Sequence, residues 1–335
     1  MLKGAIFGIS AAAIWGGMYV ISDVVLEVIP PLTLLTIRVV MGLVVLLAMM
    51  RMQKLSFPPR PVFMRVLGVG VVGFGFSLAA QFIGTALSTA VNGALVTSAS
   101  PAFILLFAAL ILREKLTPMH LLAVGLATLG VIVIVNPAEA DFGSDTFVGN
   151  LFLAIAALTW GLYSVLVRRV SLTPPQTPPR TQGGASDSPS LLAERGPGGE
   201  VNSAILTPNP SPPSGEGNAE GLNTLVLTTI AFMGGLCLTV PAMAIELTQE
   251  NIGIIDVGIV AGILYLGVIS TAGAMWLWNR AFALVDASIA SLFFFAQPLT
   301  GALLGALFLD QPMTTGLWIG IGLIVGGVLL SLRKS

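Results

Sequence analysis

The chain has 335 residues, of which 55% are hydrophobic and 9% are charged, and its formal net charge is −1. An ordinary soluble domain carries about 25% charged residues, so a soluble fold of this length could not cover its surface, and no basic face is available for nucleic acid. One histidine and one cysteine cannot build a zinc site, a Cys–His pair or an intrachain disulfide. We therefore expect no metal, no cofactor and no nucleic-acid partner.

Apolar blocks of about 20 residues follow one another along the chain, each long enough to cross about 30 Å of hydrocarbon. Short polar or proline-bearing joints separate most of them. The pattern predicts an all-α membrane protein with ten transmembrane helices in a lipid bilayer. The predicted spans are 4–22, 32–50, 65–87, 90–112, 119–136, 148–168, 222–246, 254–278, 287–309 and 313–332.

The basic residues predict the orientation of these spans. If the N-terminus lies in the cytoplasm, 14 of the 15 basic residues fall in cytoplasmic segments or at the cytoplasmic ends of spans, and only Arg38 lies well inside a span. Cytoplasmic loops carry an excess of Lys and Arg, so we expect both termini in the cytoplasm.

Residues 171–221 break the pattern, because they hold 10 of the 21 prolines and their few apolar residues show no period. Such a segment cannot bury enough apolar surface to offset the entropy lost on ordering. We predict a disordered cytoplasmic loop, and a regulatory segment is the alternative.

An internal repeat connects the two halves, because residues 81–135 align without a gap with residues 278–332. Paired prolines and glycines mark particular backbone sites and are harder to obtain from composition than paired Leu or Ala. The paired positions include Pro101/Pro298, Gly125/Gly322 and Gly130/Gly327, and near the start of each half Trp15-Gly16/Trp160-Gly161.

Each half contains five spans, and an odd number forces the second half to enter the membrane in the opposite sense. We therefore predict two inverted five-helix repeats, which is a common plan of secondary transporters. The first repeat comprises residues 1–137, and the second comprises 148–170 together with 222–335. The loop at 171–221 is then an insertion in the second repeat.

Several motifs recur in a characteristic order over everything except 171–221. They are the early Trp-Gly in each half, Arg38 early in span two, Pro101 and Pro298 in spans four and nine, Arg113-Glu114-Lys115-Leu116-Thr117 after span four, and Trp278-Asn279-Arg280-Ala281 ending span eight. Together they resemble the EamA-type family of the drug/metabolite transporter superfamily. The resemblance implies efflux of small metabolites, often amino acids, across the plasma (inner) membrane of a prokaryote. One departure is Gln311, which aligns with Glu114 where the family carries a glutamate.

Arg38 is the first candidate for a substrate contact. A charge inside a span is costly and by default marks a functional site, so Arg38 is expected to attract a substrate carboxylate or phosphate near the outer mouth of a cavity. The alternative is that its side chain extends outward to water and pairs with Glu27 or Asp23.

The other candidates are aromatic or uncharged polar residues at equivalent places in the two repeats. Aromatic residues beside glycines are suited to line a cavity for amphipathic molecules, and the alternative is ordinary helix packing. Polar residues before prolines could bond a substrate and the carbonyls freed by a kink, or simply bond neighbouring helices. The predicted substrate-binding residues are therefore Trp15, Tyr19, Arg38, Ser100, Trp160, Tyr163 and Gln297.

We consider three functions for a protein of this architecture. A secondary transporter that exports amino-acid-like or other zwitterionic or anionic solutes by alternating access is favoured, because no acidic residue lies mid-span. A cationic multidrug antiporter would need a buried carboxylate. A membrane-embedded enzyme would need clustered catalytic groups, which the scattered acids and single histidine do not supply. GxxxG pairs favour packing within one chain, so we expect a monomer or a weak homodimer.

Overall fold

The computed structural model describes residues 2–88, 96–97, 99–135, 143–172, 222–300, 304 and 315–332. All regular elements within these ranges are helices, as the apolar blocks predict. The predicted loop lies outside the described residues, except for Ser171 and Leu172, which end a helix.

The helices divide between the two halves of the chain. The first half contains α1 (Leu2–Leu26), α2 (Pro31–Met52), α3 (Arg60–Gly70), α4 (Leu78–Ala86), α6 (Ser100–Phe107) and α7 (Pro118–Val135). The second half contains α8 (Ser144–Leu172), α9 (Thr224–Glu246), α10 (Val257–Leu264), α11 (Ala274–Leu284), α12 (Ala287–Ala290) and α14 (Thr315–Leu332).

Two of the three π-helical stretches in the described residues occupy similar places in the two repeats, and the third, Ala108–Leu112, follows α6. Val71–Ser77 joins α3 to α4, and Tyr265–Gly273 joins α10 to α11. Each junction produces one continuous membrane-crossing rod, Arg60–Ala86 and Val257–Leu284. These rods are the third span of each half, so the local irregularity repeats along with the sequence.

Ten apolar helical segments in the described part of the chain account for the ten predicted spans. Five are long enough to cross a membrane alone, namely Pro31–Met52, Arg60–Ala86, Thr146–Leu172, Thr224–Glu246 and Val257–Leu284. In the other five helical segments the apolar stretch within the described residues is shorter, namely Leu2–Met18, Ser100–Leu112, Pro118–Val133, Ala287–Thr300 and Trp318–Gly327.

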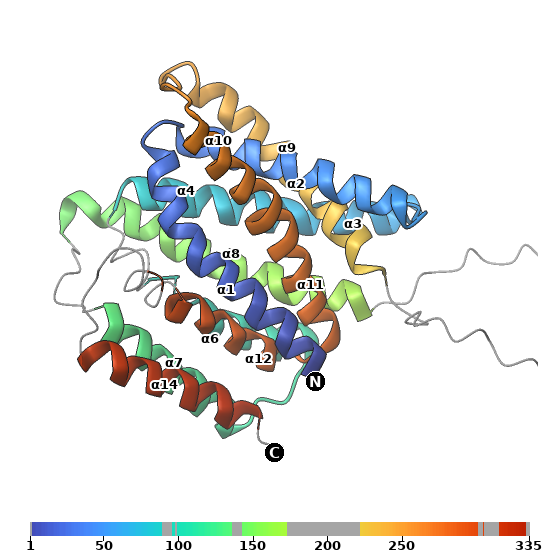
Figure 1. Ribbon diagram of the computed structural model, residues 1–335. Helices are drawn as coiled ribbons and strands as arrows, with labels where there is room; N and C mark the ends of the chain where they lie inside the picture. The colour runs from blue at the N-terminus through green and yellow to red at the C-terminus, as the bar shows by residue number, and fades with distance from the viewer. Residues whose placement is uncertain are drawn as a thin grey trace, which may run out of the picture.

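The packing of the helices follows an approximate two-fold relation between the halves. The second spans α2 and α9 pack on each other, as do the fifth spans α7 and α14. The first span of each half packs on the third span of the other, since α1 lies against α11 and α8 lies against α4 (Figure 1). This cross-packing is what two inverted repeats produce, and it places the core between them.

The paired glycines Gly130 and Gly327 mark the crossing of α7 and α14. A Cβ atom on Gly130 would lie 2.7 Å from the carbonyl oxygen of Gly320. A Cβ atom on Gly327 would lie 2.6 Å from the carbonyl oxygen of Ala123. Small residues let the two backbones approach closely, which explains the identity of these positions in both halves.

The prolines of the fourth and ninth spans act differently from each other. Pro101 lies in the first turn of α6, where the missing N–H has no intrahelical partner to lose, and most of the span that precedes it, residues 89–95 and 98, lies outside the described residues. Pro298 lies inside the helical segment Ala287–Thr300 and follows the tighter 3₁₀ stretch Ser291–Phe295. A local change of helix type is an expected response to a proline ring.

The bundle has two distinct ends. α1 begins and α14 ends at the same end (Figure 1), which we call the N-terminal end. The C-terminal turn of α1 and the start of α2 lie at the other, which we call the opposite end. An even number of crossings requires this arrangement.

Candidate functional site

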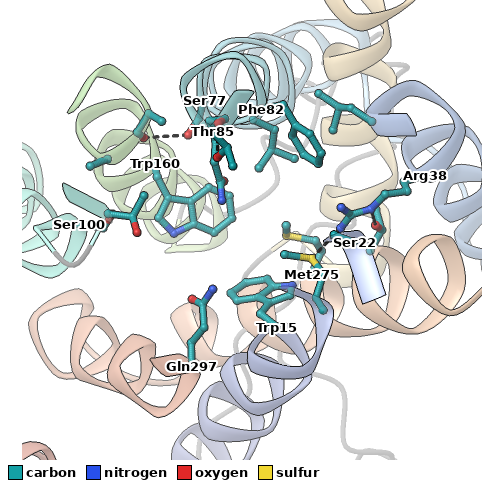
Figure 2. Close-up of a pocket in the computed structure, with 18 of the residues that line it drawn as sticks. Trp15, Ser22, Arg38, Ser77, Phe82, Thr85, Ser100, Trp160, Met275 and Gln297 are labelled. Atoms are coloured by element: carbon teal, nitrogen blue, oxygen red, sulfur yellow. Dashed lines mark hydrogen bonds between the residues drawn. The ribbon is translucent and has the colours of Figure 1, made fainter. Parts of the chain in front are cut away.

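A cavity of about 100 Å³ lies between the two repeats (Figure 2). This volume has room for roughly seven to ten waters at 10–15 Å³ each, which suits a small organic solute. Apolar side chains supply most of its wall, and they include Trp15, Met18, Phe82, Trp160, Met275 and Phe294. Polar lining residues include Ser22, Arg38, Ser77, Gln81, Thr85, Ser100, Thr271 and Gln297.

The cavity extends from mid-bundle toward the opposite end. Trp15 lies near the middle of α1, whereas Ser22 and Leu26 belong to the last turns of that helix. Thr85, at the end of α4, lines the same region. The cavity is therefore closer to the opposite end than to the N-terminal end.

Arg38 belongs to the cavity wall and is only 4% exposed. Its Nε donates to Thr271 Oγ1 at 3.1 Å, and one terminal nitrogen lies 2.9 Å from Met18 Sδ. The guanidinium carbon also lies 5.7 Å from the centre of the Phe82 ring, within cation–π range. A side chain that extends outward to water would be exposed, and the burial of Arg38 argues against that part of the alternative, whereas the side chain of Asp23, one of its two predicted acidic partners, lies outside the described residues.

Three tryptophans form an aromatic cluster, and two of them, Trp15 and Trp160, line the cavity. The ring of Trp15 lies 5.7 Å from Trp160 in an edge-to-face arrangement and 5.3 Å from Trp278. Trp15 Nε1 donates to the carbonyl oxygen of Ser270 at 3.0 Å. That carbonyl lies in the π-helical stretch, so the irregular backbone helps to hold the ring in place.

Ser100, Trp160 and Gln297 gather on the wall across from Arg38, and we call this group the polar corner (Figure 2). Gln297 is 7% exposed, and its side chain points toward the two tryptophan rings (Figure 2). Among the described residues, neither Trp160 Nε1 nor Gln297 Oε1 has a hydrogen-bond partner. A buried polar atom without a partner carries a free-energy cost of about 1–3 kcal/mol.

Five of the seven residues predicted from the sequence line the cavity, namely Trp15, Arg38, Ser100, Trp160 and Gln297. Tyr163 is fully buried behind Trp160 and is not among the lining residues. The side chain of Tyr19 lies outside the described part of the structure. Contact of any of these residues with a substrate stays a prediction.

The sequence did not single out Met18, Phe82 or Met275, which complete the apolar wall. Each lies in an apolar run, where a Met or Phe usually packs in a core. The sequence offers only an indirect indication of their role, which is their position near other candidate or motif residues. Phe82 follows Gln81, and Met275 lies three residues before Trp278.

Tyr163 takes part in a separate buried polar chain. Its hydroxyl donates to Asn279 Oδ1 at 3.0 Å, and Asn279 Nδ2 donates to Thr228 Oγ1 at 2.9 Å. The chain connects α8, α11 and α9, three helices of the second repeat. These hydrogen bonds hold the three helices in position relative to one another, next to the cavity.

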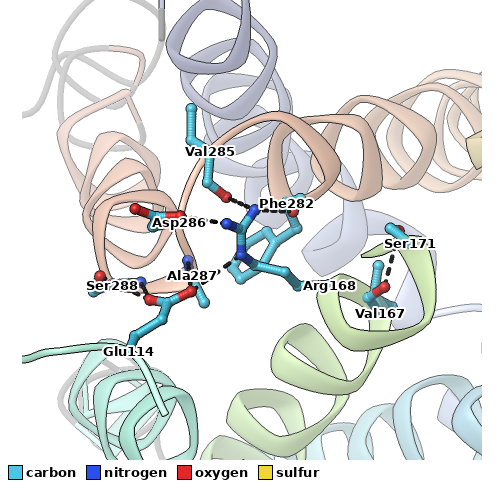
Figure 3. A network of polar contacts seen from close by, with 9 residues as sticks. All are labelled: Glu114, Val167, Arg168, Ser171, Phe282, Val285, Asp286, Ala287 and Ser288. Carbon is cyan, nitrogen blue, oxygen red and sulfur yellow. Dashed lines mark hydrogen bonds and ion pairs between the residues drawn. The ribbon is translucent and has the colours of Figure 1, made fainter. Parts of the chain in front are cut away.

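A network of ionic contacts closes the N-terminal end, and we call it the clasp (Figure 3). Glu114 accepts from Arg168 Nε at 3.1 Å and from the backbone N–H groups of Ala287 and Ser288 at 3.0 and 3.1 Å. Arg168 also donates to the carbonyl oxygens of Phe282 and Val285 and to Asp286. The clasp joins the segment after α6, the end of α8 and the start of α12.

A related contact lies at the opposite end. Glu246, the last residue of α9, accepts from the backbone N–H groups of Leu32 and Thr33 at 2.9 and 2.6 Å. Thr33 Oγ1 donates to the same carboxylate at 2.7 Å. Both carboxylates therefore cap the N-terminus of a helix, where the helix dipole favours negative charge, and in each case that helix belongs to the other repeat.

Comparisons with known proteins agree with this geometry. The EamA-like transporter family model matches residues 2–136 and 215–333. The uncharacterized transporter YetK of Bacillus subtilis is 21% identical over 99% of this chain and 88% of its own length. The putative permease-like protein YdzE of Bacillus subtilis is 48% identical over 22% of this chain and 92% of its own length.

Two further comparisons bear on the function and on the fold. The aromatic amino acid exporter YddG of Ancylobacter novellus is 30% identical over 35% of this chain and 40% of its own length. A crystal structure with 18% sequence identity superposes with a TM-score of 0.74 and covers 99% of both chains. At that identity the superposition shows the fold alone.

The family match covers both halves, and its members are transporters, so the membrane-enzyme alternative is excluded. The cavity between two inverted repeats is the feature that a transporter of this plan requires. The chain belongs to the EamA-like transporter family and is a multi-pass membrane transporter.

Proposed function

We propose that this protein is a secondary transporter that exports small zwitterionic or anionic solutes, such as amino acids, across the plasma membrane by alternating access. The observation that carries the proposal is a buried arginine in the wall of a small, mostly apolar cavity. A guanidinium offers a planar fork of N–H donors that matches a carboxylate. The same positive charge disfavours organic cations.

The aromatic wall supports a solute with an apolar body. Trp15, Trp160 and Phe82 present rings to the cavity, which suits an apolar or aromatic side chain. The aromatic amino acid exporter YddG, a partial relative, carries a solute class of this kind according to its name. A zwitterion with an aromatic side chain would place its carboxylate near Arg38 and its ring among these residues.

In the proposed transport cycle, the clasp holds one side of the transporter closed. With both termini in the cytoplasm, the cavity extends toward the outside, and the Glu114–Arg168 contacts close the cytoplasmic side. Opening to the cytoplasm would separate α12 from the segment after α6, so these contacts would have to break. The two repeats could then rock relative to each other, so that the central cavity closes toward the outside and opens toward the cytoplasm.

The proposal is tested by transport in liposomes with labelled amino acids and uncharged analogues. Arg38→Ala should lower kcat/KM for carboxylate solutes by about 10-fold to 100-fold, which corresponds to the 1.5–3 kcal/mol of a hydrogen bond to a charged group. Arg38→Lys should restore part of it, because a lysine lacks the bidentate fork. Arg51→Ala removes the same charge at an exposed position of the same helix and serves as the control.

Equal loss for charged and uncharged solutes in Arg38→Ala, in proportion to the amount of folded protein, would show that Arg38 is structural. The carboxylate proposal would then be wrong.

A further inference from the structure

We infer that the polar corner selects solutes that carry a hydroxyl, or a similar hydrogen-bonding group, at the end remote from their carboxylate. This inference rests on the proposed function, because it takes Arg38 as the carboxylate site. It adds a second recognition point inside the same cavity. The consequence is discrimination between solutes that differ by one polar group.

Two buried polar atoms lie in the polar corner. Trp160 Nε1 is a donor and Gln297 Oε1 is an acceptor, and neither has a partner among the described residues. Both residues line the cavity, and Gln297 is 7% exposed. Native proteins leave few buried polar groups unsatisfied, and a group that is satisfied only when a ligand binds is one explanation.

One hydroxyl group on a solute would satisfy both atoms. A hydroxyl group donates one hydrogen bond and accepts others, so a single hydroxyl can donate to Gln297 Oε1 and accept from Trp160 Nε1–H. An apolar group in the same place leaves both atoms unpaired. A site built to bond a hydroxyl therefore rejects the analogue that lacks it more strongly than an apolar pocket rejects an added hydroxyl.

The two recognition points lie on different sides of the cavity. Arg38 lies on one side of the cavity and the polar corner on the other, with Trp15 and Met275 between them (Figure 2). In an α-amino acid the ammonium and carboxylate groups are attached to the same carbon. When the carboxylate binds Arg38, the ammonium group therefore cannot reach the polar corner on the other side of the cavity. A solute that reaches both has a carboxylate at one end, an apolar body and a hydroxyl at the far end, and tyrosine is one example.

Tyrosine and phenylalanine differ only in that hydroxyl, so their ratio of kcat/KM in liposomes isolates the polar corner. The wild-type protein should favour tyrosine. Gln297→Met keeps the length of the side chain but removes the acceptor, and Trp160→Phe keeps an aromatic ring but removes the donor. Each should lower the tyrosine-to-phenylalanine ratio by about five- to tenfold, and mainly through tyrosine.

Gln53→Met is the control, since it makes the same substitution at an exposed position directly after α2 that is not among the cavity-lining residues. This variant should leave the ratio unchanged. The two substituted positions belong to different helices, so the test survives if one variant fails to fold.

Three outcomes are distinct. An unchanged ratio in both Gln297→Met and Trp160→Phe overturns the inference and leaves the proposed function standing. Arg38-dependent transport of other carboxylates without transport of either aromatic solute also overturns it. No transport of any carboxylate by the wild-type protein contradicts the proposed function itself.

Discussion

Arg38 shows how a costly residue can be retained inside a membrane helix. Insertion scales place the cost of an arginine at mid-span at about 2.5–3.5 kcal/mol. The Thr271 hydroxyl, the Met18 sulfur and the Phe82 ring all contact the guanidinium and offset part of that cost. Sequence reasoning could find Arg38 because a single basic residue within a span is conspicuous. It could not decide whether the side chain turns to water or to the bundle.

Trp160 and Tyr163 show the limit of sequence reasoning for single residues. They are three positions apart on α8, so their side chains diverge by about 60° around the helix. Trp160 faces the cavity, whereas Tyr163 faces Asn279. The sequence identifies both as aromatic residues on one helix, but the rotation of that helix is set by packing against α4, α6 and α11.

This difference leads to a prediction for Tyr163→Phe. The substitution removes the hydroxyl that donates to Asn279, so the free energy of unfolding should fall by about 0.6–1.7 kcal/mol, the measured range for such bonds in membranes. The KM for carboxylate solutes should stay within about twofold, because the hydroxyl does not reach the cavity. Unfolding in mixed micelles and transport in liposomes measure the two effects. A severalfold rise in KM at unchanged stability would place Tyr163 in the site instead.

At the scale of elements, the periodicity and paired glycines predicted the helices and the repeat, but not their local irregularities. The two π-helical stretches depend on how the third span of each half packs against the opposite repeat. The sequence predicts one span, 90–112, that runs through Pro101, whereas the structure has a turn at Ala99 and begins α6 at Ser100.

The clasp was also beyond sequence reasoning. Glu114 and Arg168 are 54 positions apart, and Arg168 and Asp286 are 118 positions apart. Each residue lies at the end of a span, where a charge is ordinary, so nothing in the sequence pairs them. Their contact follows from the cross-packing of the repeats.

The clasp predicts that Glu114→Gln favours opening at the N-terminal end. The substitution removes the negative charge that attracts Arg168 and the helix dipole of α12, so the open population should rise about fivefold or more, as ~1 kcal/mol produces. The measurement is the reaction rate of a cavity cysteine, Ser100→Cys in a Cys237→Ser background, with a membrane-impermeant reagent. The rate from the N-terminal side should rise.

Glu246→Gln provides the matched control, because Glu246 caps α2 in a similar way at the opposite end. It should not raise the rate from the N-terminal side. An equal rise in both variants would indicate general loosening of the bundle rather than release of the clasp.

At the scale of the whole molecule, the distribution of basic residues predicts which end faces the cytoplasm. α1 begins and α14 ends at one end of the bundle (Figure 1), and the described parts of α8 and α9 that flank the predicted loop also meet there. A cysteine introduced by Ser190→Cys, again in a Cys237→Ser background, should therefore be protected from impermeant reagent in intact cells. It should react once the cells are opened. Labelling of intact cells would reverse the assigned orientation.

The central claim is that the transporter recognises its solutes by their carboxylate group, which binds in the cavity. Competition between two ligands that differ in that carboxylate tests the claim most directly. Liposomes with the wild-type protein are loaded with a labelled aromatic amino acid, and its efflux is measured against excess unlabelled competitor. The free amino acid should inhibit strongly. Its methyl ester, which keeps the side chain but lacks the carboxylate and carries a net positive charge, should inhibit at least 10-fold more weakly, as the loss of ~1.4 kcal/mol produces. Equal inhibition by the two would contradict the account.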